Sequence, residues 1–288
     1  MEFAIIGNNY QAEKAVHTQR LLQFLYQRGA TVKINRSFYN FILPYIGKLE
    51  FKPILFDEQD FTADMVVSMG GDGTFLKAAR LVGNKNIPII GINTGRLGFL
   101  ADVSYNHIEE TFTDILLGNY VLEKRSLLKL KSNIPNIEYP YALNEIAILK
   151  RDHASMITIH THIDHSYLAT YQSDGLIVAT PTGSTAYSLS VGGPIIEPTS
   201  KTLVINPIAP HSLNVRPFII PDAVTIHLKI ESRSHNFLIS VDGRSYKCNE
   251  ETEVCISRAE HSTIIVKRQN HHFYDTLREK LMWGADKR

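Results

Sequence analysis

Residues 65–83 read MVVSMGGDGTFLKAARLVG, and this stretch decides the fold of the first half of the chain. Its first five residues are mostly apolar, which is typical of a buried strand. The glycine-rich turn Gly70–Gly73 ends that strand abruptly. The apolar residues that follow, from Phe75 to Val82, recur at helical spacing until the next glycine. The stretch therefore predicts a strand, a glycine turn and a helix.

In the rest of residues 1–119, short apolar runs alternate with segments whose apolar residues recur at helical spacing. Runs at residues 3–6, 31–34 and 87–92 predict further buried strands. Residues 12–26 show helical spacing. Because strands that alternate with helices pair in parallel, we expect an open α/β domain with a mostly parallel sheet. In such domains, ligands bind beyond the carboxyl ends of the strands.

Beyond this domain the apolar period changes to two. Residues 156–163 and 224–231 alternate apolar with polar side chains. This alternation predicts an antiparallel, β-rich domain over residues 120–270 with one face buried. Helical spacing returns in residues 184–191 and in a C-terminal helix within residues 271–288, which could pack back on the first domain.

The composition excludes several classes of protein. The chain has 288 residues, with 30 Lys and Arg against 29 Asp and Glu and a formal net charge of +1. Proteins that coat nucleic acid or lie on membranes carry a large cationic excess, so we expect neither partner here. The 44% hydrophobic and 20% charged fractions fit a globular protein of about two domains.

The sequence carries no targeting signal that we recognise. Its N-terminus, MEFAIIGN, has an acidic residue in place of a basic region, and its apolar run is short. No stretch approaches the roughly 18 apolar residues that span a bilayer. Cys248 and Cys255 do not make a disulfide framework and are expected to be reduced. These observations favour a cytoplasmic protein.

The turn Gly70–Gly73 is the strongest local candidate for chemistry. Glycines let the backbone approach phosphate oxygens, and the N-terminus of the following helix offers unpaired N–H groups. A carboxylate among them, here Asp72, can orient or deprotonate an attacking hydroxyl in phosphoryl transfer. The alternative is a plain tight turn in which Asp72 caps the helix.

A second candidate is residues 180–194, TPTGSTAYSLSVGGP. A Pro-Thr-Gly turn opens the segment, and Ser184 or Thr185 can cap the helix that follows. Caps account for one or two hydroxyls, whereas the segment holds six Ser and Thr residues together with Tyr187. Small donors beside an aromatic face suit the hydroxyls, amides and rings of a nucleotide.

A third candidate is the dipeptide Asn144-Glu145, which precedes the apolar run at residues 146–149. Adjacent residues in a strand point to opposite faces, so at most one of the two is expected to face the core. An edge strand would explain the dipeptide equally well.

Other patterns exclude several known sites. The sequence lacks Gly-x-x-x-x-Gly-Lys-Ser/Thr, and Gly91, Gly95 and Gly98 lack the Gly-x-Gly-x-x-Gly spacing. His160 and His162 could in principle ligate a metal. The alternation places them on a polar face, and no cysteine or acidic ligand joins them at zinc-site spacing. A solvated histidine face is therefore favoured.

The three candidates, taken in this order, resemble the NAD kinase family. That family pairs an α/β domain carrying Gly-Gly-Asp-Gly with a β-rich domain carrying Asn-Glu and Thr-Pro-Thr-Gly-Ser-Thr-Ala-Tyr-Ser-Leu-Ser, here at residues 70–73, 144–145 and 180–190. Residues 93–100, NTGRLGFL, also match. The resemblance implies transfer of the ATP γ-phosphoryl group to the 2′-hydroxyl of the adenosine ribose of NAD, which makes NADP. It also implies Mg²⁺ or another divalent cation, and an active site between the two domains.

The resemblance also implies a role for individual residues. Asp72 would be the general base, and Gly70, Gly71 and Gly73 would border the phosphates of ATP. The residues implied to bind NAD are Asp72, Gly73, Lys77, Asn144, Glu145, Asp174, Thr182, Thr185, Ala186, Tyr187, Ser188, Leu189, Ser190 and Ala209. Two positions depart from the family pattern: Gln172 stands where many members have Arg, and Arg244 where others have Gln or a different residue.

Two other functions stay open from the sequence. A kinase of the same superfamily that acts on a sugar phosphate or a lipid needs Gly70–Gly73 but has no need of residues 182–190. A non-catalytic NAD-binding sensor would keep the pocket and have no use for Asp72. Members of the NAD kinase family are generally homodimers or homotetramers, and we expect a homo-oligomer here.

Overall fold

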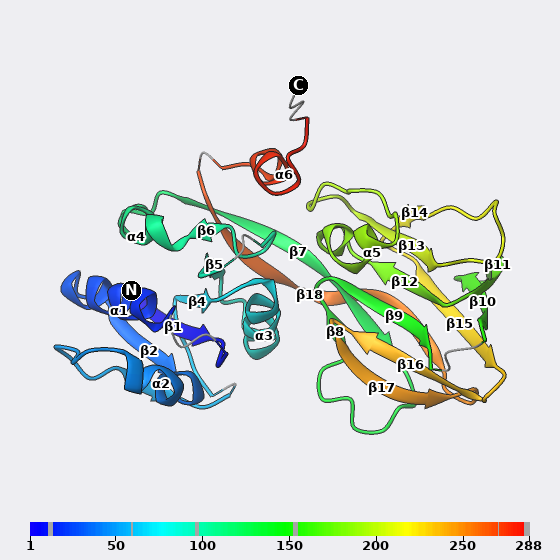
Figure 1. The fold of residues 1–288 in the computed structure, drawn as a ribbon, viewed down its shortest axis with the longest axis horizontal. Coiled ribbons are helices and arrows are strands. Elements are labelled where there is room, and N and C mark those ends of the chain that lie inside the picture. The colour runs from blue at the N-terminus through cyan, green and yellow to red at the C-terminus, as the bar shows by residue number, and fades with distance from the viewer. Residues whose placement is uncertain (11–13, 59, 96–97, 152–154, 270, 285–288) are drawn as a thin grey trace. The chain divides into compact units, whose positions relative to one another are not determined.

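A computed structural model describes residues 1–10, 14–58, 60–95, 98–151, 155–269 and 271–284. The chain divides into two compact units (Figure 1). The first, which we call the α/β unit, consists of Met1–Lys124 and Thr263–Arg288. The second, which we call the β unit, consists of Arg125–Ser262. Among the described residues, no helix is both long and apolar enough to cross a bilayer.

The α/β unit contains a parallel sheet with its strands in the order β3, β2, β1, β4, β5 and β18, and with β6 beside β5. Its own strands are β1 (Glu2–Gly7), β2 (Thr31–Asn35), β3 (Ile54–Phe56), β4 (Met65–Met69), β5 (Ile89–Asn93) and β6 (Val103–Ser104). Its helices are α1 (Ala15–Gln27), α2 (Arg36–Ile42), η2 (Leu43–Tyr45), α3 (Asp72–Val82), η3 (Tyr105–His107), α4 (Ile108–Leu116) and α6 (Phe273–Leu281). Strands β7 (Tyr120–Lys131) and β18 (Val254–Arg268) have residues in both units. The predicted parallel α/β fold is thus confirmed.

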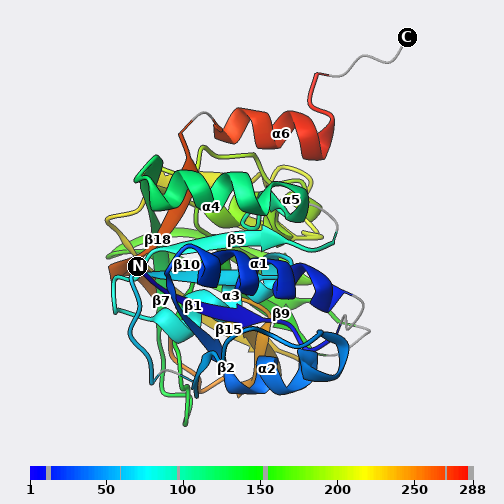
Figure 2. The same cartoon turned by 90° about the vertical axis from the view of Figure 1, so that its left-hand side faces the viewer.

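Helices cover the sheet of the α/β unit, and its central strands are buried on both faces. In β1, Phe3 and Ile5 belong to a core cluster that includes residues of α1 and α4, two helices seen in front of the strands in Figure 2. The rings of Phe3 and Phe112 meet edge to face at 5.6 Å. Ala4 and Ile6, which point the other way, are also fully buried. Burial on both faces explains why these strands read as continuous apolar runs.

The decisive stretch folds as its pattern predicts, with one difference in the helix boundary. Strand β4 covers residues 65–69, and α3 ends before Gly83, whose positive φ of 56° closes the helix. Helix α3 begins at Asp72, so that half of the glycine turn lies in its first turn. The helix predicted for residues 12–26 is α1, of which residues 11–13 lie outside the described part of the chain.

The β unit is antiparallel, as its alternating pattern predicts. One sheet has the order β14, β13, β12, β9, β16 and β17; the other places β11, β10, β15 and β18 side by side, with β7 on β18 and β8 on β7. The strands not yet given are β8 (Tyr141–Ala142), β9 (Glu145–Lys150), β10 (Ile157–Ile163), β11 (Ser166–Ser173), β12 (Gly175–Ala179), β13 (Thr202–Ile208), β14 (Phe218–Pro221), β15 (Thr225–Ser232), β16 (Asn236–Val241) and β17 (Arg244–Asn249). The predicted helix at residues 184–191 appears as two short pieces, η4 (Thr182–Thr185) and α5 (Tyr187–Ser190).

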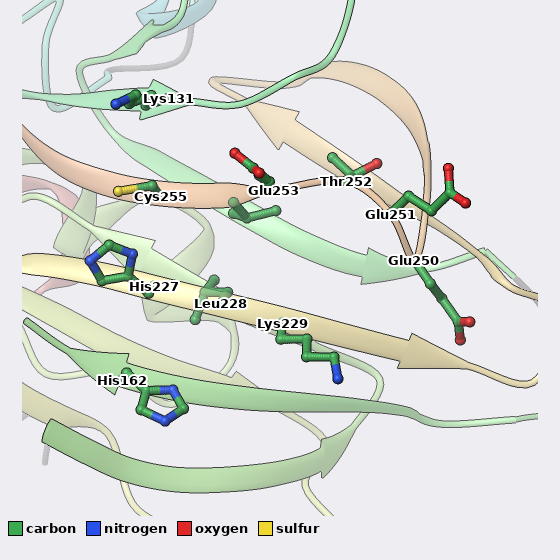
Figure 3. A pocket seen from close by; sticks show the side chains of 11 residues that line it. Lys131, His162, His227, Leu228, Lys229, Glu250, Glu251, Thr252, Glu253 and Cys255 are labelled. Carbon is green, nitrogen blue, oxygen red and sulfur yellow. The ribbon is translucent and has the colours of Figure 1, made fainter. Parts of the chain in front are cut away.

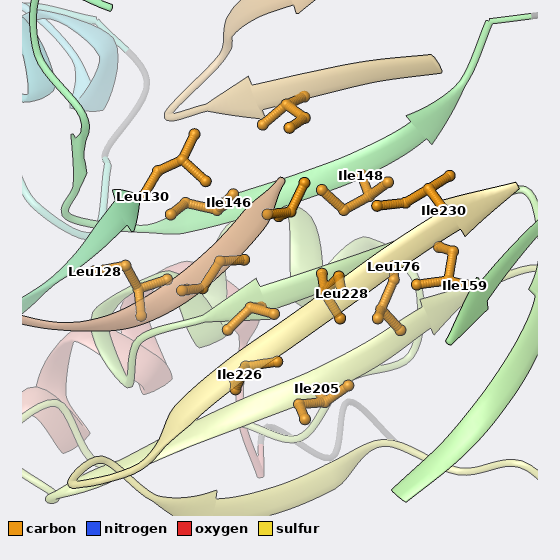
Figure 4. Close-up of a cluster of buried hydrophobic side chains, with 14 of the residues drawn as sticks. Leu128, Leu130, Ile146, Ile148, Ile159, Leu176, Ile205, Ile226, Leu228 and Ile230 are labelled. Carbon is orange, nitrogen blue, oxygen red and sulfur yellow. The ribbon is translucent and has the colours of Figure 1, made fainter. Parts of the chain in front are cut away.

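The two sheets of the β unit share one apolar core. Figure 4 shows Ile146, Leu176 and Ile205 of the six-stranded sheet with Ile159 and Leu228 of the other sheet, all members of one buried cluster. These residues alternate with partly or fully exposed side chains in β10 and β15, as expected for strands with one wet face. Strands β9 and β12 both pack into this core, and the candidate site residues lie at the ends of these strands.

Cys248 and Cys255 are free thiols in the structure, as expected from the sequence.

Candidate functional site

The Asp72 carboxylate is held by three consecutive backbone N–H groups. Phe99 donates to Oδ2 at 2.7 Å, and Leu100 and Ala101 donate to Oδ1 at 2.9 and 3.0 Å. Gly71 is the N-cap of α3, and no side chain caps the helix. The simple alternative, in which Asp72 caps its own helix, is therefore wrong. Because Oδ2 accepts only one of these bonds, it can accept another from a bound hydroxyl.

Gly98 directly precedes the three N–H donors, and the Asp72 carboxylate can lie against this backbone only if residue 98 is glycine. A Cβ on Gly98 would overlap the Asp72 carboxylate, so no other residue fits there without displacing it. Gly98 belongs to the segment at residues 93–100 that matched the family pattern, although residues 96 and 97 lie outside the described part. We name the arrangement of Asp72 with the N–H groups of residues 99–101 the Asp72 clamp.

The backbone of the glycine turn is open beyond Asp72. A Cβ on Gly71 or on Gly73 would meet nothing within 4 Å, which leaves room for a ligand against the backbone. Lys77 lies four residues after Gly73 and hence on the same side of α3. Burial and the nearby charge of Arg80 lower the pKa of Lys77, so an anion beside it would stabilise its charged form. The turn thus offers N–H groups and a cation to a phosphate.

Asp242 of the β unit holds the start of β9 by the same pattern of hydrogen bonds. Leu143 donates its N–H to Oδ2 at 2.7 Å, and Asn144 and Glu145 donate to Oδ1 at 2.9 and 3.1 Å. We name this arrangement the Asp242 clamp. The clamp sets the backbone of the Asn144-Glu145 dipeptide, the third candidate from the sequence.

Asn144, which directly precedes β9, and Glu145, the first residue of β9, differ in their surroundings. Asn144 is buried, whereas Glu145 is half-buried and accepts the N–H of Tyr187. Burial, together with the adjacent Asp242 carboxylate, raises the pKa of Glu145 to about 8. Its Oε2 is buried and has no hydrogen-bond partner among the described residues. A buried carboxyl with an unsatisfied oxygen is a candidate for ligand binding.

The segment at residues 180–190 is tied to the same dipeptide. The N–H of Thr180 donates to the carbonyl of Asn144 at 2.9 Å, and its hydroxyl donates to the carbonyl of Leu143 at 2.6 Å. A Cβ on Gly183 would overlap the backbone of Asn144, so the glycine of the Pro-Thr-Gly turn is needed for this contact. The structure therefore brings together Asn144, Glu145 and the segment, which are about 35 residues apart in the chain.

Several hydroxyls of this segment point into the protein. Ser184 donates to the carbonyl of Pro181 at 2.6 Å, and Ser188 lies 3.2 Å from the amide nitrogen of Asn206, which donates to it. Thr182 is buried and accepts a bond from Arg125. Both hydroxyls thus accept hydrogen bonds within the protein, and the binding of NAD by Thr182 and Ser188 stays a prediction. The residues of the segment with accessible side chains are Thr185, Ala186, Tyr187, Leu189 and Ser190.

Asp174 and Ala209 form a separate group at the other end of β12. The N–H of Asp174 donates to the carbonyl of Ile208, and its carboxylate pairs with Lys150 at 2.6 Å. Ala209 has a positive φ of 43° at the turn that follows β13. Strand β12 has five residues, so roughly 16 Å separates this group from the Asn144 group.

The two positions that depart from the family pattern have different surroundings. Gln172 is exposed, and its carbonyl accepts the N–H of His211. Arg244 donates to the carbonyls of Tyr139 and Tyr141 at 2.8 and 2.9 Å, with its guanidinium over the Tyr139 ring. Arg244 therefore braces the loop before β8.

A hollow on the β unit has none of the predicted site residues in its lining. It has a volume of about 420 Å³ and is lined by His162, His227, Cys255, Lys131 and neighbouring residues (Figure 3). His162 and His227 are partners across β10 and β15. Within the described ranges, no group of three or more His, Cys, Asp or Glu side chains is arranged to hold a metal.

Comparison with known proteins identifies the class. Residues 3–120 match the family model described as the ATP-NAD kinase N-terminal domain, and residues 143–268 match the ATP-NAD kinase C-terminal domain. An NAD kinase of Bacteroides fragilis is 59% identical over 290 residues, covering 100% of both chains. An NAD kinase of Porphyromonas gingivalis is 44% identical and covers 99% of this chain and 98% of its own.

Two solved structures share the fold. The yeast NADH kinase complexed with NADH has a TM-score of 0.88 and 25% identity, covering 100% of this chain and 89% of its own. An NAD kinase from Archaeoglobus fulgidus in complex with ATP has a TM-score of 0.78 and 26% identity, covering 98% of this chain and 99% of its own. An α/β unit with a Gly-Gly-Asp-Gly turn, followed by an antiparallel β unit, thus defines a kinase.

More narrowly, the chain belongs to the NAD kinase family, and it is an enzyme that phosphorylates NAD to NADP with ATP.

Proposed function

We propose that Asp72 is the general base of this kinase, which takes the proton of the 2′-hydroxyl on the adenosine ribose of NAD. The Asp72 clamp is the observation that supports the assignment. It fixes a carboxylate at the N-terminus of α3 and leaves Oδ2 with room for one more hydrogen bond. Because the carboxylate is already held in one orientation, less conformational entropy is lost when the base and the hydroxyl align for the reaction.

The reaction transfers the γ-phosphoryl group of ATP in line with the attacking oxygen. The activation barrier is lowered mainly in two ways: the reacting groups are positioned, and the charge on the equatorial oxygens is stabilised. We assign the phosphates of ATP to the backbone of Gly70, Gly71 and Gly73, where the structure leaves the Cβ directions of Gly71 and Gly73 open. Lys77, on the same side of α3, is assigned to the dinucleotide or its phosphates.

The acceptor dinucleotide is assigned to the β unit. Asn144 and Glu145 are held by the Asp242 clamp, and the ring of Tyr187 is exposed beside them, 38% accessible. With a pKa of about 8, Glu145 carries a proton at neutral pH and can donate a hydrogen bond as well as accept one. Asp174 and Ala209 are assigned to a more distant part of NAD, since a dinucleotide is long enough to reach beyond one cluster.

The divalent cation enters this proposal with ATP. Mg²⁺ is usually held by one or two carboxylates together with substrate phosphates, and so it needs no cage of protein ligands. The residues present fit this mode, because the described part of the chain gathers no cage of three or more metal-binding side chains, and the one open acceptor position on Asp72 Oδ2 stays with the substrate hydroxyl. When bound, the cation would neutralise charge on the phosphates.

The remaining assignments also stay proposals. Residues 1–119, with the C-terminal helix, would carry the base and the ATP phosphates, and residues 120–270 would bind NAD. A homodimer or homotetramer and a cytoplasmic location are predicted from the sequence.

A coupled assay tests the proposed function. Purified protein is incubated with ATP, Mg²⁺ and NAD, and NADP is detected with an NADP-specific dehydrogenase. We expect NADP to form. Turnover of a sugar phosphate or diacylglycerol without turnover of NAD would instead indicate a related kinase, and binding of NAD without any turnover would indicate a sensor.

A further inference from the structure

The C-terminal helix α6 carries a lysine to the Asp72 clamp. The helix starts with a capping box between His272 and Asp275, and it buries Leu277 in the α/β unit. Near its end, the Nζ atom of Lys280 lies 4.7 Å from the centre of the Phe99 ring. Phe99 is the residue whose N–H binds Oδ2 of Asp72. The lysine and the carboxylate thus share one neighbour.

The ammonium group of Lys280 is buried without a hydrogen-bond acceptor. Its Nζ is shielded from solvent and has no such partner in the described part of the chain. Asp102, one of the carboxylates whose charge acts on Lys280, is buried and already bonded to Lys267, with His271 Nδ1 at 3.6 Å. Burying an ammonium group without an acceptor is unfavourable. The Phe99 ring offsets part of this cost through a cation–π contact.

Charges on three elements and one loop act on this ammonium group. Asp72 on α3 and Asp102 after β5 raise its pKa, as does Glu279 on α6, whereas Lys267 on β18 lowers it. Burial outweighs the carboxylates and lowers the pKa of Lys280 to about 8. An anion that approached Nζ would therefore find a cation whose hydrogen-bonding capacity is unused.

We propose that Lys280 binds the transferred γ-phosphoryl group of ATP and stabilises its negative charge in the transition state. This inference rests on the proposed role of Asp72. The hydroxyl that loses its proton to Asp72 must also face the γ-phosphorus, so the phosphoryl group passes close to the Asp72 clamp. The ammonium group of Lys280, which lies close to that clamp, can therefore donate a hydrogen bond to an equatorial oxygen of the phosphoryl group.

The chemical step balances with these two residues. A bond forms between the ribose 2′-oxygen and the γ-phosphorus, and the bond from the γ-phosphorus to the bridging oxygen of ADP breaks. The electron pair of the broken bond leaves with ADP, and the hydroxyl proton goes to Asp72. Lys280 stays protonated throughout and donates hydrogen bonds only. Nothing else in the chain changes its covalent state.

A matched set of variants tests the role of Lys280. Lys280→Met keeps the length and apolar stem of the side chain but removes its charge, and Lys280→Arg keeps the charge. Lys85→Met is the control, because Lys85 also belongs to the α/β unit and lies 4.0 Å over a ring, that of Phe61, to whose carbonyl it donates. The full-length protein is assayed with ATP, Mg²⁺ and NAD, and melting temperatures are recorded.

We expect Lys280→Met to lower kcat/KM for ATP by about 10²-fold, the scale of losing one donor to transition-state charge. KM for NAD should stay within about threefold, and Lys280→Arg should recover at least about tenfold, since it restores a cation. A second readout needs no turnover: calorimetry with a non-hydrolysable ATP analogue and Mg²⁺ should show weaker binding to Lys280→Met. For the unmodified protein this binding should weaken as the pH rises through about 8, and the Met variant should lack that change.

Three results would overturn the proposal. The first is a kcat/KM for ATP of Lys280→Met within about threefold of the unmodified protein. The second is an equal loss in Lys280→Met and Lys85→Met, which would indicate a structural role. The third is unchanged binding of the ATP analogue by Lys280→Met. Failure of the Asp72 assignment gives a different result, because Asp72→Asn would then turn over normally while Lys280→Met still bound the analogue weakly.

Discussion

The Asp72 clamp and the Asp242 clamp are built from the same hydrogen bonds. In each, one carboxylate oxygen accepts a single backbone N–H at 2.7 Å and the other accepts the next two N–H groups of the chain. In each, the carboxylate fixes the backbone of a distant segment. The pattern alone therefore does not distinguish a catalytic carboxylate from a structural one.

The surroundings of the two carboxylates differ. Asp72 begins a helix between two glycines whose Cβ directions are open to a ligand. Asp242 and Gly243 have φ values of 46° and 78° and form the two-residue turn between β16 and β17, typical of an Asp-Gly hairpin. Asp242 is enclosed by the segment it holds, so we assign it a positioning role for Asn144 and Glu145. We infer that access to a ligand separates the proposed catalytic role of Asp72 from the positioning role of Asp242.

The largest effect is expected from Asp72→Asn. The amide cannot take a proton and offers one acceptor oxygen where the carboxylate offered two. We expect kcat to fall by at least about 10²-fold, with NAD still bound, on the scale of a lost general base. Steady-state kinetics and NAD titration measure both quantities. A near-normal kcat would refute the assignment of Asp72 as the base.

A slightly smaller effect is expected from Gly98→Ala. The added methyl group overlaps the Asp72 carboxylate and must displace it, and a displacement of about 1 Å can lower the rate by about 10²-fold. We expect kcat to fall between about 10- and 100-fold. Gly47→Ala is the control, since its Cβ would meet only the flexible end of Gln19. If Gly98→Ala had the same kcat as Gly47→Ala, the exact position of the Asp72 carboxylate would not matter for turnover.

Asp242→Asn tests the other side of the comparison. It removes one of the acceptors for the N–H groups of residues 143–145, which should cost about 1–3 kcal/mol in the free energy of unfolding. Because Asn144 and Glu145 lose their support, we expect KM for NAD to rise about tenfold while kcat changes little. Denaturant unfolding and kinetics measure these effects. A collapse of kcat with an unchanged KM would make Asp242 resemble Asp72 and break the distinction.

For Glu145→Gln the expected effect lies in the pH dependence of stability. The pKa of Glu145 is about 8 in the folded protein and roughly 4.3 in an unfolded chain. Between these values the folded state binds more protons, so this group's contribution to stability is lost as the pH rises through that window. The glutamine variant should therefore gain melting temperature relative to the unmodified protein between pH 5 and pH 9.

The matched control for that measurement is the exposed Glu138→Gln. Its melting temperature should follow that of the unmodified protein across the pH range. If the Glu145→Gln difference is the same at pH 5 and pH 9, the carboxyl does not hold a proton in the folded protein.

Local patterns predict many residues of the candidate site, and their roles stay proposals. The turn at Gly70–Gly73 and the segment at residues 180–190 stand out because glycines and small hydroxyl residues have few alternative uses at such density. The pattern did not reveal that Thr182 and Ser188 point inward, because a hydroxyl in a sequence looks the same whether it binds a ligand or a neighbouring amide. Only the packing of β7 and β13 against this segment shows the difference.

The residues that sequence reasoning missed are those that act through the backbone or over long separations. Asp242 binds an N–H group 99 residues away, and Asp72 binds one 27 residues away. A backbone N–H has no side-chain signature, so the partners of these carboxylates could not be read from residue types. The sequence held one sign of this contact, the glycine at position 98. The structure explains that glycine, because a Cβ there would overlap the Asp72 carboxylate.

The sequence by itself determined the strand, turn and helix of residues 65–83, the change of period near residue 120 and the family of the enzyme, because these depend on local spacing and on motifs read in order. Only the tertiary structure decided which groups hold Asp72, which hydroxyls remain available, and that Lys280 reaches the ring of Phe99. These depend on contacts between segments far apart in the chain, and such contacts are set by how the strands and helices pack.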